Sequence, residues 1–403
     1  MLVSSTGGLL FVFNRNICFL IFAALIVFSL FYIGKGLKKS VYYSSLVTFL
    51  VVFFLFGINF SFAINHQSLT KYSFFGITIF TTILTLLYFN NQGDKNVFIN
   101  SLYVVLKLIL FHSLLSFLAY FFVKDSLVLI TSKYHESLTY NYLFYYSVKT
   151  GSVFNVLGLD LCRNAGIFWE PGILQGYLNI LFFLEFSIFK RNKILLVLIA
   201  VAILSTYSTT GLFLLMIQLI YFLQKEFKKN IALVLIMIIC IPFYILLSSN
   251  MNEKIYGEGE SSFQKRLIDL TQPLFIAFQN PLTGVGLDID SFQKVREEFY
   301  INSNLNNVLR QIGIEQKSET TSKGSTNSVM YMLAGMGFPT AILFIFMFIK
   351  QQIVKKDRFI WFVITFFTVM SEPLLLRPFF FIFILSGFFH FVYNIAGYKK
   401  QLA

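Results

Sequence analysis

ILLVLIAVAILSTYSTTGLFLLMIQLIYFL, residues 194–223, is a run of 30 residues that is apolar except at its centre. A helix needs roughly 17 to 25 residues to cross the hydrocarbon core of a bilayer, so this run is too long for one untilted span. Its centre, STYSTTG (205–211), is polar and ends in glycine. We therefore predict two short membrane helices that meet at a polar turn.

The composition of the whole chain indicates the same class of protein. Of its 403 residues, 52 are Phe and 21 are Tyr, and only 13% are charged. Soluble domains carry about 25% charged residues, so this composition excludes a soluble globular protein.

Nine further apolar runs approach or reach the length of a membrane span. They cover residues 17–33, 41–64, 73–89, 98–123, 173–189, 231–249, 327–349, 359–374 and 379–396. Together with the divided run this makes 11 spans, or 12 if residues 1–14 form a further short one. We therefore predict an all-α polytopic membrane protein, with residues 1–403 forming one integral membrane domain.

Lysine and arginine give the orientation, because short basic connectors stay in the cytoplasm. Six alternate connectors together carry +13, which equals the formal net charge of the chain. They are residues 34–40, 90–96, 190–193, 224–230, 350–358 and 397–403. The C-terminus is therefore expected in the cytoplasm. The basic balance follows from topology, and no nucleic-acid partner is expected.

This orientation places two long connectors outside, at residues 124–172 and 250–325. The second contains eight Lys or Arg and ten Asp or Glu. It is long enough to fold as a cap over the membrane domain, and connectors of this length tend to be functional.

Metal and cofactor chemistry has no support in the sequence. The three cysteines and four histidines are scattered without ligand spacing. The pair Asp288 and Asp290 has the spacing that nucleotide-sugar transferases use for a metal and a diphosphate, but two acids around one apolar residue are common by chance. No metal site and no cofactor are predicted.

Arginines in and beside the outer connectors suggest phosphate binding, because guanidinium forks form paired hydrogen bonds to phosphate oxygens. Two lie beside membrane spans: Arg163 opens RNAGIFWEPG (163–172), and Arg377 lies in SEPLLLRP (371–378). The others are Arg266, Arg296 and Arg310. The alternative is that these side chains are solvated or pair with loop acids.

Two other kinds of side chain are candidates for the site. Lys107 lies near the middle of a span, where a charge is costly and suggests a cavity or a partner. Tyr142 and Tyr145 belong to a group of five tyrosines between residues 134 and 146. Their rings are suited either to stacking on sugars or to an aromatic belt at the membrane interface.

Four segments, taken in order, resemble the Wzy-type polysaccharide polymerases. RNAGIFWEPG is similar to the Arg and Gly-x-Phe-x-Glu-Pro signature that introduces a membrane helix in that family, and STYSTTG resembles a Ser/Thr-Gly break in a later helix. Residues 264–266, followed by NPLTGVGLD (280–288), resemble the large outer loop shared by O-antigen polymerases and O-antigen ligases. STNSVMYMLAGMGFP (325–339) resembles the start of the next helix, and the likeness covers about residues 160–378.

One position separates the two activities of this superfamily. Ligases usually have a histidine just before the asparagine that opens the helix after the large loop. Here Thr326 precedes Asn327, which favours the polymerase. The O-antigen ligase, and a lipid-linked oligosaccharide flippase or transporter, remain the alternatives.

The resemblance implies a helical fold of the GT-C type in the bacterial inner membrane. It implies an inverting, metal-independent glycosyl transfer between undecaprenyl-diphosphate-linked glycans on the outer face, in company with a chain-length regulator protein. The product would be an O-antigen, capsular or other surface polysaccharide.

The resemblance also suggests roles for individual residues. Arg163 and Arg266 would hold the diphosphate, with Arg377 as a third ligand and Arg296 and Arg310 as further candidates. Glu170 would accept the proton of the attacking hydroxyl, or would be a structural acid at a helix start. Further residues expected to line the substrate cavity are Ser208, Thr209, Asn327, Lys107, Tyr142 and Tyr145.

Overall fold

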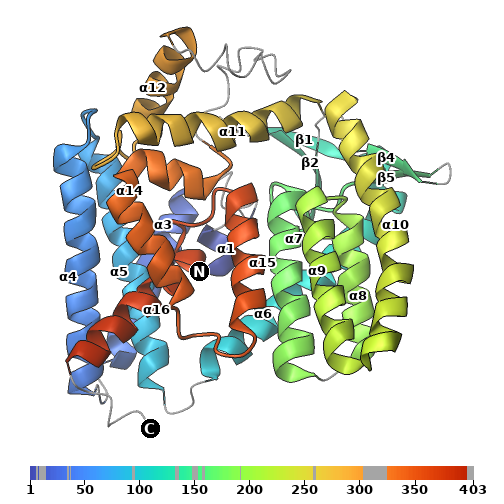
Figure 1. Ribbon diagram of the computed structural model, residues 1–403, viewed down its shortest axis with the longest axis horizontal. Helices are drawn as coiled ribbons and strands as arrows, with labels where there is room; N and C mark the ends of the chain where they lie inside the picture. Colours follow the sequence, from blue (N-terminus) through green and yellow to red (C-terminus); the bar gives the residue numbers. More distant parts are fainter. Residues whose placement is uncertain are drawn as a thin grey trace.

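The computed structural model is an assembly of membrane-length helices with small sheets at one end (Figure 1). It describes residues 1–5, 8, 15–33, 36, 38–92, 96–131, 136–147, 153–156, 159–190, 192–256, 260–302 and 325–396.

The helices form two groups that α15 (Arg358–Ser371) joins (Figure 1). One group contains α4 (Lys39–Phe62), α5 (Leu69–Asn91), α14 (Ser328–Ile349) and α16 (Pro378–Ile395), with α3 (Arg15–Ile33) against α5. The other contains α6 (Val97–Val123), α7 (Pro171–Phe183) with its π-helical continuation η2 (Leu184–Phe189), α8 (Lys193–Ser205), α9 (Thr209–Glu226) and α10 (Lys229–Tyr256).

The predicted membrane spans are present as helices. Among the described residues, seven helices are long and apolar enough to cross a membrane, and three shorter apolar helices accompany them. The run at 194–223 is divided into α8 and α9 at the polar turn, as expected. The chain is therefore a multi-pass membrane protein. At the N-terminus, α1 (Leu2–Ser5) is too short to cross, and most of residues 6–14 lie outside the described part of the chain.

Helix α7 lies in the interior of the bundle. All 13 of its residues are buried, and it contacts α6, α8, α9 and α15. Its far end is fixed at Asp357, which accepts hydrogen bonds from Ser187 in η2 and from Tyr221 and Lys225 in α9. Burial raises the pKa of the Asp357 carboxyl, but the hydrogen bonds from these three side chains outweigh that effect and lower it.

Helix α11 (Glu260–Gln279) lies across one end of the bundle, which we call the capped end, and α12 (Ile289–Asn302) projects beyond it (Figure 1). The cap predicted from residues 250–325 therefore contains helices, and its residues 257–259 and 303–324 lie outside the described part of the chain.

The connector at 124–172 contains five short strands, which the sequence did not predict. β1 (Val128–Thr131), β2 (Glu136–Tyr140) and β3 (Phe144–Tyr146) form one antiparallel sheet, and β4 (Val153–Val156) and β5 (Leu159–Cys162) form another. Strands of three to five residues give too little alternation of polar and apolar side chains to be recognised in a sequence.

Helix α14 is broken at Gly337, which has φ 76° and ψ 166°. A break inside a membrane helix leaves backbone groups without their helical partners, and these must be satisfied within the protein. The N–H of Phe338 donates to the carbonyl of Pro281 at 2.8 Å. The partner therefore comes from the segment 281–288, which the sequence places in the cap.

The same segment satisfies the carbonyls before the break. The N–H of Val285 donates to Ala334 O, and the N–H of Gly286 donates to Gly335 O, each at 2.9 Å. These bonds make the PLTGVGLD segment an integral part of the broken helix.

Asn59 in α4 fastens both partners of this junction. Its amide donates to Thr283 O at 2.7 Å and to Gly335 O at 2.8 Å, and it is 2% exposed. Its own oxygen accepts a hydrogen bond from the hydroxyl of Tyr72, which in turn accepts from the N–H of Leu287.

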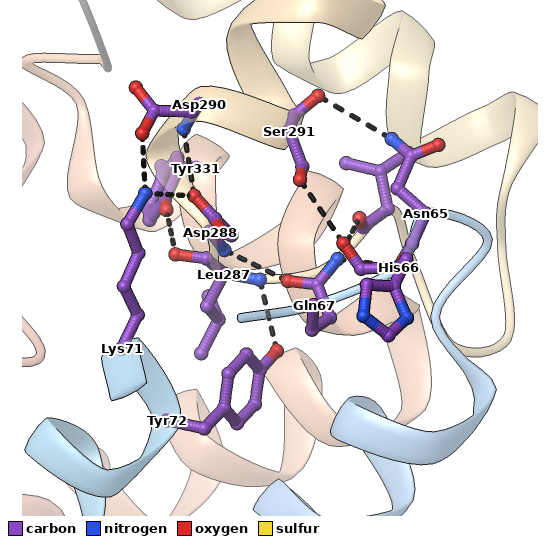
Figure 2. A network of polar contacts seen from close by, with 11 residues as sticks. Asn65, His66, Gln67, Lys71, Tyr72, Leu287, Asp288, Asp290, Ser291 and Tyr331 are labelled. Carbon is purple, nitrogen blue, oxygen red and sulfur yellow. Dashed lines mark hydrogen bonds and ion pairs between the residues drawn. The ribbon is translucent and has the colours of Figure 1, made fainter. Parts of the chain in front are cut away.

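The end of the segment is held by charge as well (Figure 2). Lys71 at the start of α5 forms ion pairs with both Asp288 and Asp290. The side chain of Gln67 accepts from the N–H of Asp288 and donates to Val285 O, each at 3.0 Å. The two aspartates thus anchor the cap to α5.

Gly284 tests this junction. It has φ 68°, and a Cβ at this position would lie 2.5 Å from Ala334 O. We expect Gly284→Ala to destabilise the folded protein by roughly 1–3 kcal/mol, because the added carbon overpacks a fixed backbone contact. The measurement is thermal unfolding in detergent micelles.

Gly57→Ala is the matched control. Gly57 lies inside α4 with open space around its Cβ position, and alanine favours a helix over glycine. Equal unfolding temperatures for Gly284→Ala and Gly57→Ala would contradict the predicted role of the junction.

Candidate functional site

Four helices begin at the capped end: α7, α9, α14 and α16 (Figure 1). A helix N-terminus carries N–H groups without helical partners and a partial positive charge. The capped end therefore combines four such termini. Their partial positive charges favour an anionic group at this end of the bundle.

The connector between α15 and α16, residues 371–377, joins three of these helix starts. The hydroxyl of Ser328, the first residue of α14, donates to Glu372 O at 3.1 Å and accepts from the N–H of Leu375 at 3.2 Å. The same connector leads into α16 at Pro378. The starts of α14 and α16 are therefore fixed to one short segment.

Glu372 extends this junction to α7. Its side chain is 2% exposed, and a Cβ built on Gly172 would lie 1.8 Å from its Oε1. Gly172 is the second residue of α7, so the carboxyl of Glu372 packs directly on the N-terminus of that helix. Glu372 was not among the residues predicted for the site, although SEPLLLRP (371–378) contains it.

Glu170 is the N-cap residue of α7 and is half-buried. Its side chain makes no capping hydrogen bond, and Pro171 occupies the first helical position as expected. Two carboxyl groups from distant parts of the sequence therefore belong to the start of one helix.

Arg163 is brought to the turn between α8 and α9. Its Nε donates to Thr206 O at 3.2 Å, and its side chain is half-buried. The N–H of Asn164 donates to Ser205 O at 3.0 Å. The segment RNAG (163–166) is thus hydrogen-bonded to the helix break STYSTTG (205–211). The two segments are separate motifs in the sequence.

Asn164 also joins this pair to α6. Its side-chain amide donates to Ser205 Oγ at 2.9 Å and to Ser113 O at 3.0 Å, and its oxygen accepts from the N–H of Gly166 at 3.0 Å. It is 4% exposed. The three bonds fix the position of Arg163. Asn164 was not among the residues predicted for the site.

The helix break itself is braced from α10. Tyr207 in the turn has φ 45°, a conformation that non-glycine residues rarely adopt. Asn250 donates to Tyr207 O at 3.1 Å and accepts from the hydroxyl of Thr209 at 2.6 Å. Of the two predicted cavity residues here, Thr209 is therefore engaged with Asn250, and Ser208 is buried as the N-cap of α9.

The remaining arginines occupy different places. Arg377 is exposed at the start of α16 and interacts electrostatically with Tyr331, and Arg266 is half-buried on α11. Arg296 is buried in the cap, where it donates to Gln272 Oε1 at 2.7 Å and to Asp269 Oδ1 at 3.2 Å. Arg310 lies outside the described residues.

Asp269 links the cap to the start of α14. Besides Arg296 it accepts hydrogen bonds from the N–H of Thr326 at 2.8 Å and from its hydroxyl at 2.7 Å. Asn327, predicted to line the cavity, is the N-cap of α14 and accepts from the N–H of Met330. The position that separates ligases from polymerases in the resemblance is therefore an anchoring point for α11.

Lys107 lies away from these groups. Its ammonium is 4.6 Å from the ring centre of Tyr103, whose hydroxyl donates to the buried Glu185 in η2 at 2.5 Å. Because η2 is the end of α7 opposite Gly172, Lys107 is nearer to that opposite end than to Arg163.

The two predicted tyrosines differ in exposure. Tyr145 is 6% exposed in β3, whereas Tyr142 is 68% exposed in the turn between β2 and β3. The ring of Tyr142 is thus available for a contact outside the chain, and that of Tyr145 is packed within it.

Other features of the described residues do not suggest a competing site. No group of three or more His, Cys, Asp or Glu that could hold a metal ion occurs among them. A small hollow between α14, α15 and α16 has an apolar lining, and none of the predicted arginines borders it. Its lining residues are Val329, Phe344, Ile345, Phe348, Phe366, Leu375 and Ile384.

Comparison with known proteins supports the resemblance at the level of the superfamily. Residues 194–345, from α8 into α14, match a protein-family model described as O-antigen ligase. The match supports the O-antigen ligase and polymerase superfamily of membrane glycosyltransferase-like enzymes. No curated protein and no solved structure matches the chain.

The thiol beside Arg163 offers a test of this region. Cys162 is 4% exposed, and burial raises its pKa to about 11. Because the thiolate is the reactive form, we expect a membrane-impermeant maleimide at pH 7.5 to leave Cys162 unlabelled in the folded protein and to label it after denaturation. Rapid labelling of the folded protein, located by mass spectrometry, would contradict the burial of Cys162 at the end of β5.

Proposed function

We propose that this protein is a polymerase that joins lipid-linked oligosaccharide repeat units into a surface polysaccharide. Its substrates would be glycans on undecaprenyl diphosphate, and the reaction would be an inverting glycosyl transfer that needs no metal. The pairing of the Arg163 segment with the α8–α9 break, beside the start of α7, is the observation that carries the proposal.

The charge distribution at the capped end supports a diphosphate leaving group. Transfer of the sugar breaks the bond between its anomeric carbon and the diphosphate oxygen, so negative charge develops on the diphosphate. Fixed guanidinium groups and helix N-termini stabilise such charge without a metal ion. Arg163 is the first ligand of the diphosphate in this scheme, and Arg266 and Arg377 are the second and third.

The hydroxyl oxygen of the acceptor sugar would bond to the anomeric carbon on the face opposite the departing diphosphate. Glu170 would accept the proton that this hydroxyl loses. In our proposal Glu372, and not Glu170, is the structural acid that stabilises the N-terminus of α7. The carboxyl of Glu372 packs on the second residue of α7, where the helix dipole favours a negative charge. Glu170 at the N-cap is then the group that accepts the proton of the attacking hydroxyl.

Thr326 favours the polymerase over the ligase. The resemblance gives ligases a histidine at this position, and here the threonine hydroxyl donates to Asp269. The residue thus serves to attach the cap and has no group suited to proton transfer. The family match is described by the ligase and fits both activities, so O-antigen ligase remains the second candidate.

The setting follows from the same proposal. The protein would lie in the bacterial inner membrane with its C-terminus in the cytoplasm and the capped end outside, and a chain-length regulator would be its partner. A flippase for lipid-linked oligosaccharides is the remaining alternative, and the family match weighs against it.

Arg163 provides the direct test. Arg163→Ala should lower polymer formation on the order of 10²-fold, the usual loss when one donor to a developing anion is removed. Arg163→Lys should restore little of it, because lysine lacks the paired donors of the guanidinium fork. The readout is the chain-length ladder of surface polysaccharide in the native host, at matched protein level. A full ladder with Arg163→Ala would sink the assignment.

Gly172 and Glu372 test the division of roles between the two glutamates. Gly172→Ala should impair folding, since the added Cβ would collide with the Glu372 carboxyl. The double variant Gly172→Ala with Glu372→Ala removes the collision, so protein level and unfolding temperature should recover. We expect polymer formation to recover as well, because Glu170, the proposed proton acceptor, is unchanged in this variant.

Glu372→Gln supplies the charge-only comparison, because it keeps the shape of the side chain. Loss of the ladder in a stable double variant, or in a stable Glu372→Gln variant, would contradict this division of roles. Glu170→Gln should abolish the ladder while leaving the unfolding temperature unchanged.

A deletion strain separates the candidate functions. Loss of a polymerase leaves single repeat units on the lipid A core and on outer-leaflet carrier lipid. Loss of a ligase leaves long polymer on undecaprenyl diphosphate, and loss of a flippase leaves repeat units on the inner leaflet. Either of the last two outcomes would overturn the polymerase proposal.

A further inference from the structure

The turn between β2 and β3 has an unusual residue at its tip. Leu143 N donates to Tyr140 O at 3.0 Å, and the two central residues, Asn141 and Tyr142, have φ 49° and 56°. This is the geometry of a type I′ turn, whose second central position normally holds glycine. Tyrosine is unfavourable there, so its presence needs a compensating contact.

Local bonds hold the turn but do not use the tyrosine ring. Tyr142 N donates to the hydroxyl of Thr139 at 3.1 Å, and that hydroxyl donates to Phe144 O at 3.0 Å. The Tyr142 side chain is 68% exposed and that of the next residue, Leu143, is 62% exposed. A bulky aromatic and a leucine therefore project together from a well-fixed tip.

The position of the tip along the bundle is set by α6. His112 Nε2 lies 2.9 Å from Leu143 O, and the Tyr146 hydroxyl donates to Ser116 O at 2.9 Å. The residue after His112, Ser113, accepts from Asn164, whose same amide donates to Ser205 at the end of α8. The tip thus lies level with the turn between α8 and α9 at the capped end.

The surface of α6 beside the tip faces lipid. Leu108, Phe111 and Leu115 are 64%, 63% and 42% exposed. Residues three and four apart share one face of a helix, so these side chains form an apolar stripe that passes His112. The tip lies beside this stripe, at His112.

We propose that Tyr142 and Leu143 insert into the boundary between headgroups and acyl chains of the leaflet at the capped end. The partner of this surface is phospholipid. Tyrosine suits that boundary because its ring is apolar and its hydroxyl remains wet. The β2–β3 hairpin is then a membrane anchor of the connector at 124–172, and this assignment does not depend on the reaction that the protein catalyses.

The test places a reporter at the tip of the full-length protein. In a chain with Cys18, Cys162 and Cys240 replaced by alanine, Tyr142→Cys is labelled with a bimane dye and reconstituted in phosphatidylcholine and phosphatidylglycerol nanodiscs. Leu108→Cys is the control in lipid, and Glu297→Cys, exposed on α12, is the control in water.

We expect brominated lipid to quench the dye at position 142 as it does at 108, and aqueous iodide to quench it far less than at 297. Quenching by iodide as strong as at 297, without quenching by brominated lipid, would overturn the proposal. That result would leave the exposed ring for a ligand such as a sugar.

A second variant guards against a labelled protein that does not fold. Tyr142→Trp keeps an aromatic ring and adds a fluorescent tryptophan at the tip. Tyr142→Phe, which contains only the two native tryptophans, gives the background fluorescence to subtract. If the fluorescence of the tryptophan at position 142 is blue-shifted and is quenched by brominated lipid, the membrane anchor is supported. If it has the emission wavelength of a tryptophan in water, the anchor is contradicted.

Discussion

Backbone groups that a helix break leaves without partners are the constraint on which this structure depends. In an apolar environment each such group must be satisfied within the protein, and two breaks occur beside the candidate site. The break at Gly337 is satisfied by the segment 281–288, and the break at residues 205–208 is satisfied by Asn164, Arg163 and Asn250. The first break thus fixes part of the cap, and the second fixes the segment that carries Arg163.

This constraint explains why motifs far apart in the sequence meet in space. Arg163 reaches α8 because the carbonyls of Ser205 and Thr206 need donors at the end of that helix. The glycines of PLTGVGLD allow its backbone to approach α14 closely enough to donate to Ala334 and Gly335. The site is therefore built largely from main-chain hydrogen bonds, with a few asparagine side chains fixing the junctions.

Much of the fold could be predicted from the sequence, because long apolar runs and their basic connectors are strong signals. The division at 205–211 could be recognised because a polar turn interrupts an overlong run. The break at Gly337 was not predicted, because Met336 and Phe338 continue the apolar run, although Pro339 lies two residues further on. The strands between Val128 and Cys162 were missed because each is too short to show a period.

The candidate site was predicted less completely. Arg163 was selected by its motif, and its role in binding substrate stays a prediction. Glu372, Asn164 and Asn250 were missed because their importance lies in contacts with distant residues that the sequence does not reveal. Arg296 shows the opposite case, since an arginine in a polar loop turned out to be paired with Asp269 in the cap.

Helix α7 is held at both of its termini. Glu372 presses on Gly172 at one terminus, and at the other Asp357 holds the hydroxyl of Ser187 in η2. With every residue between them buried, the helix has no room to slide along its axis or to rotate. Helix α7 is therefore the fixed axis of its group, and α6, α8, α9 and α15 take their places around it.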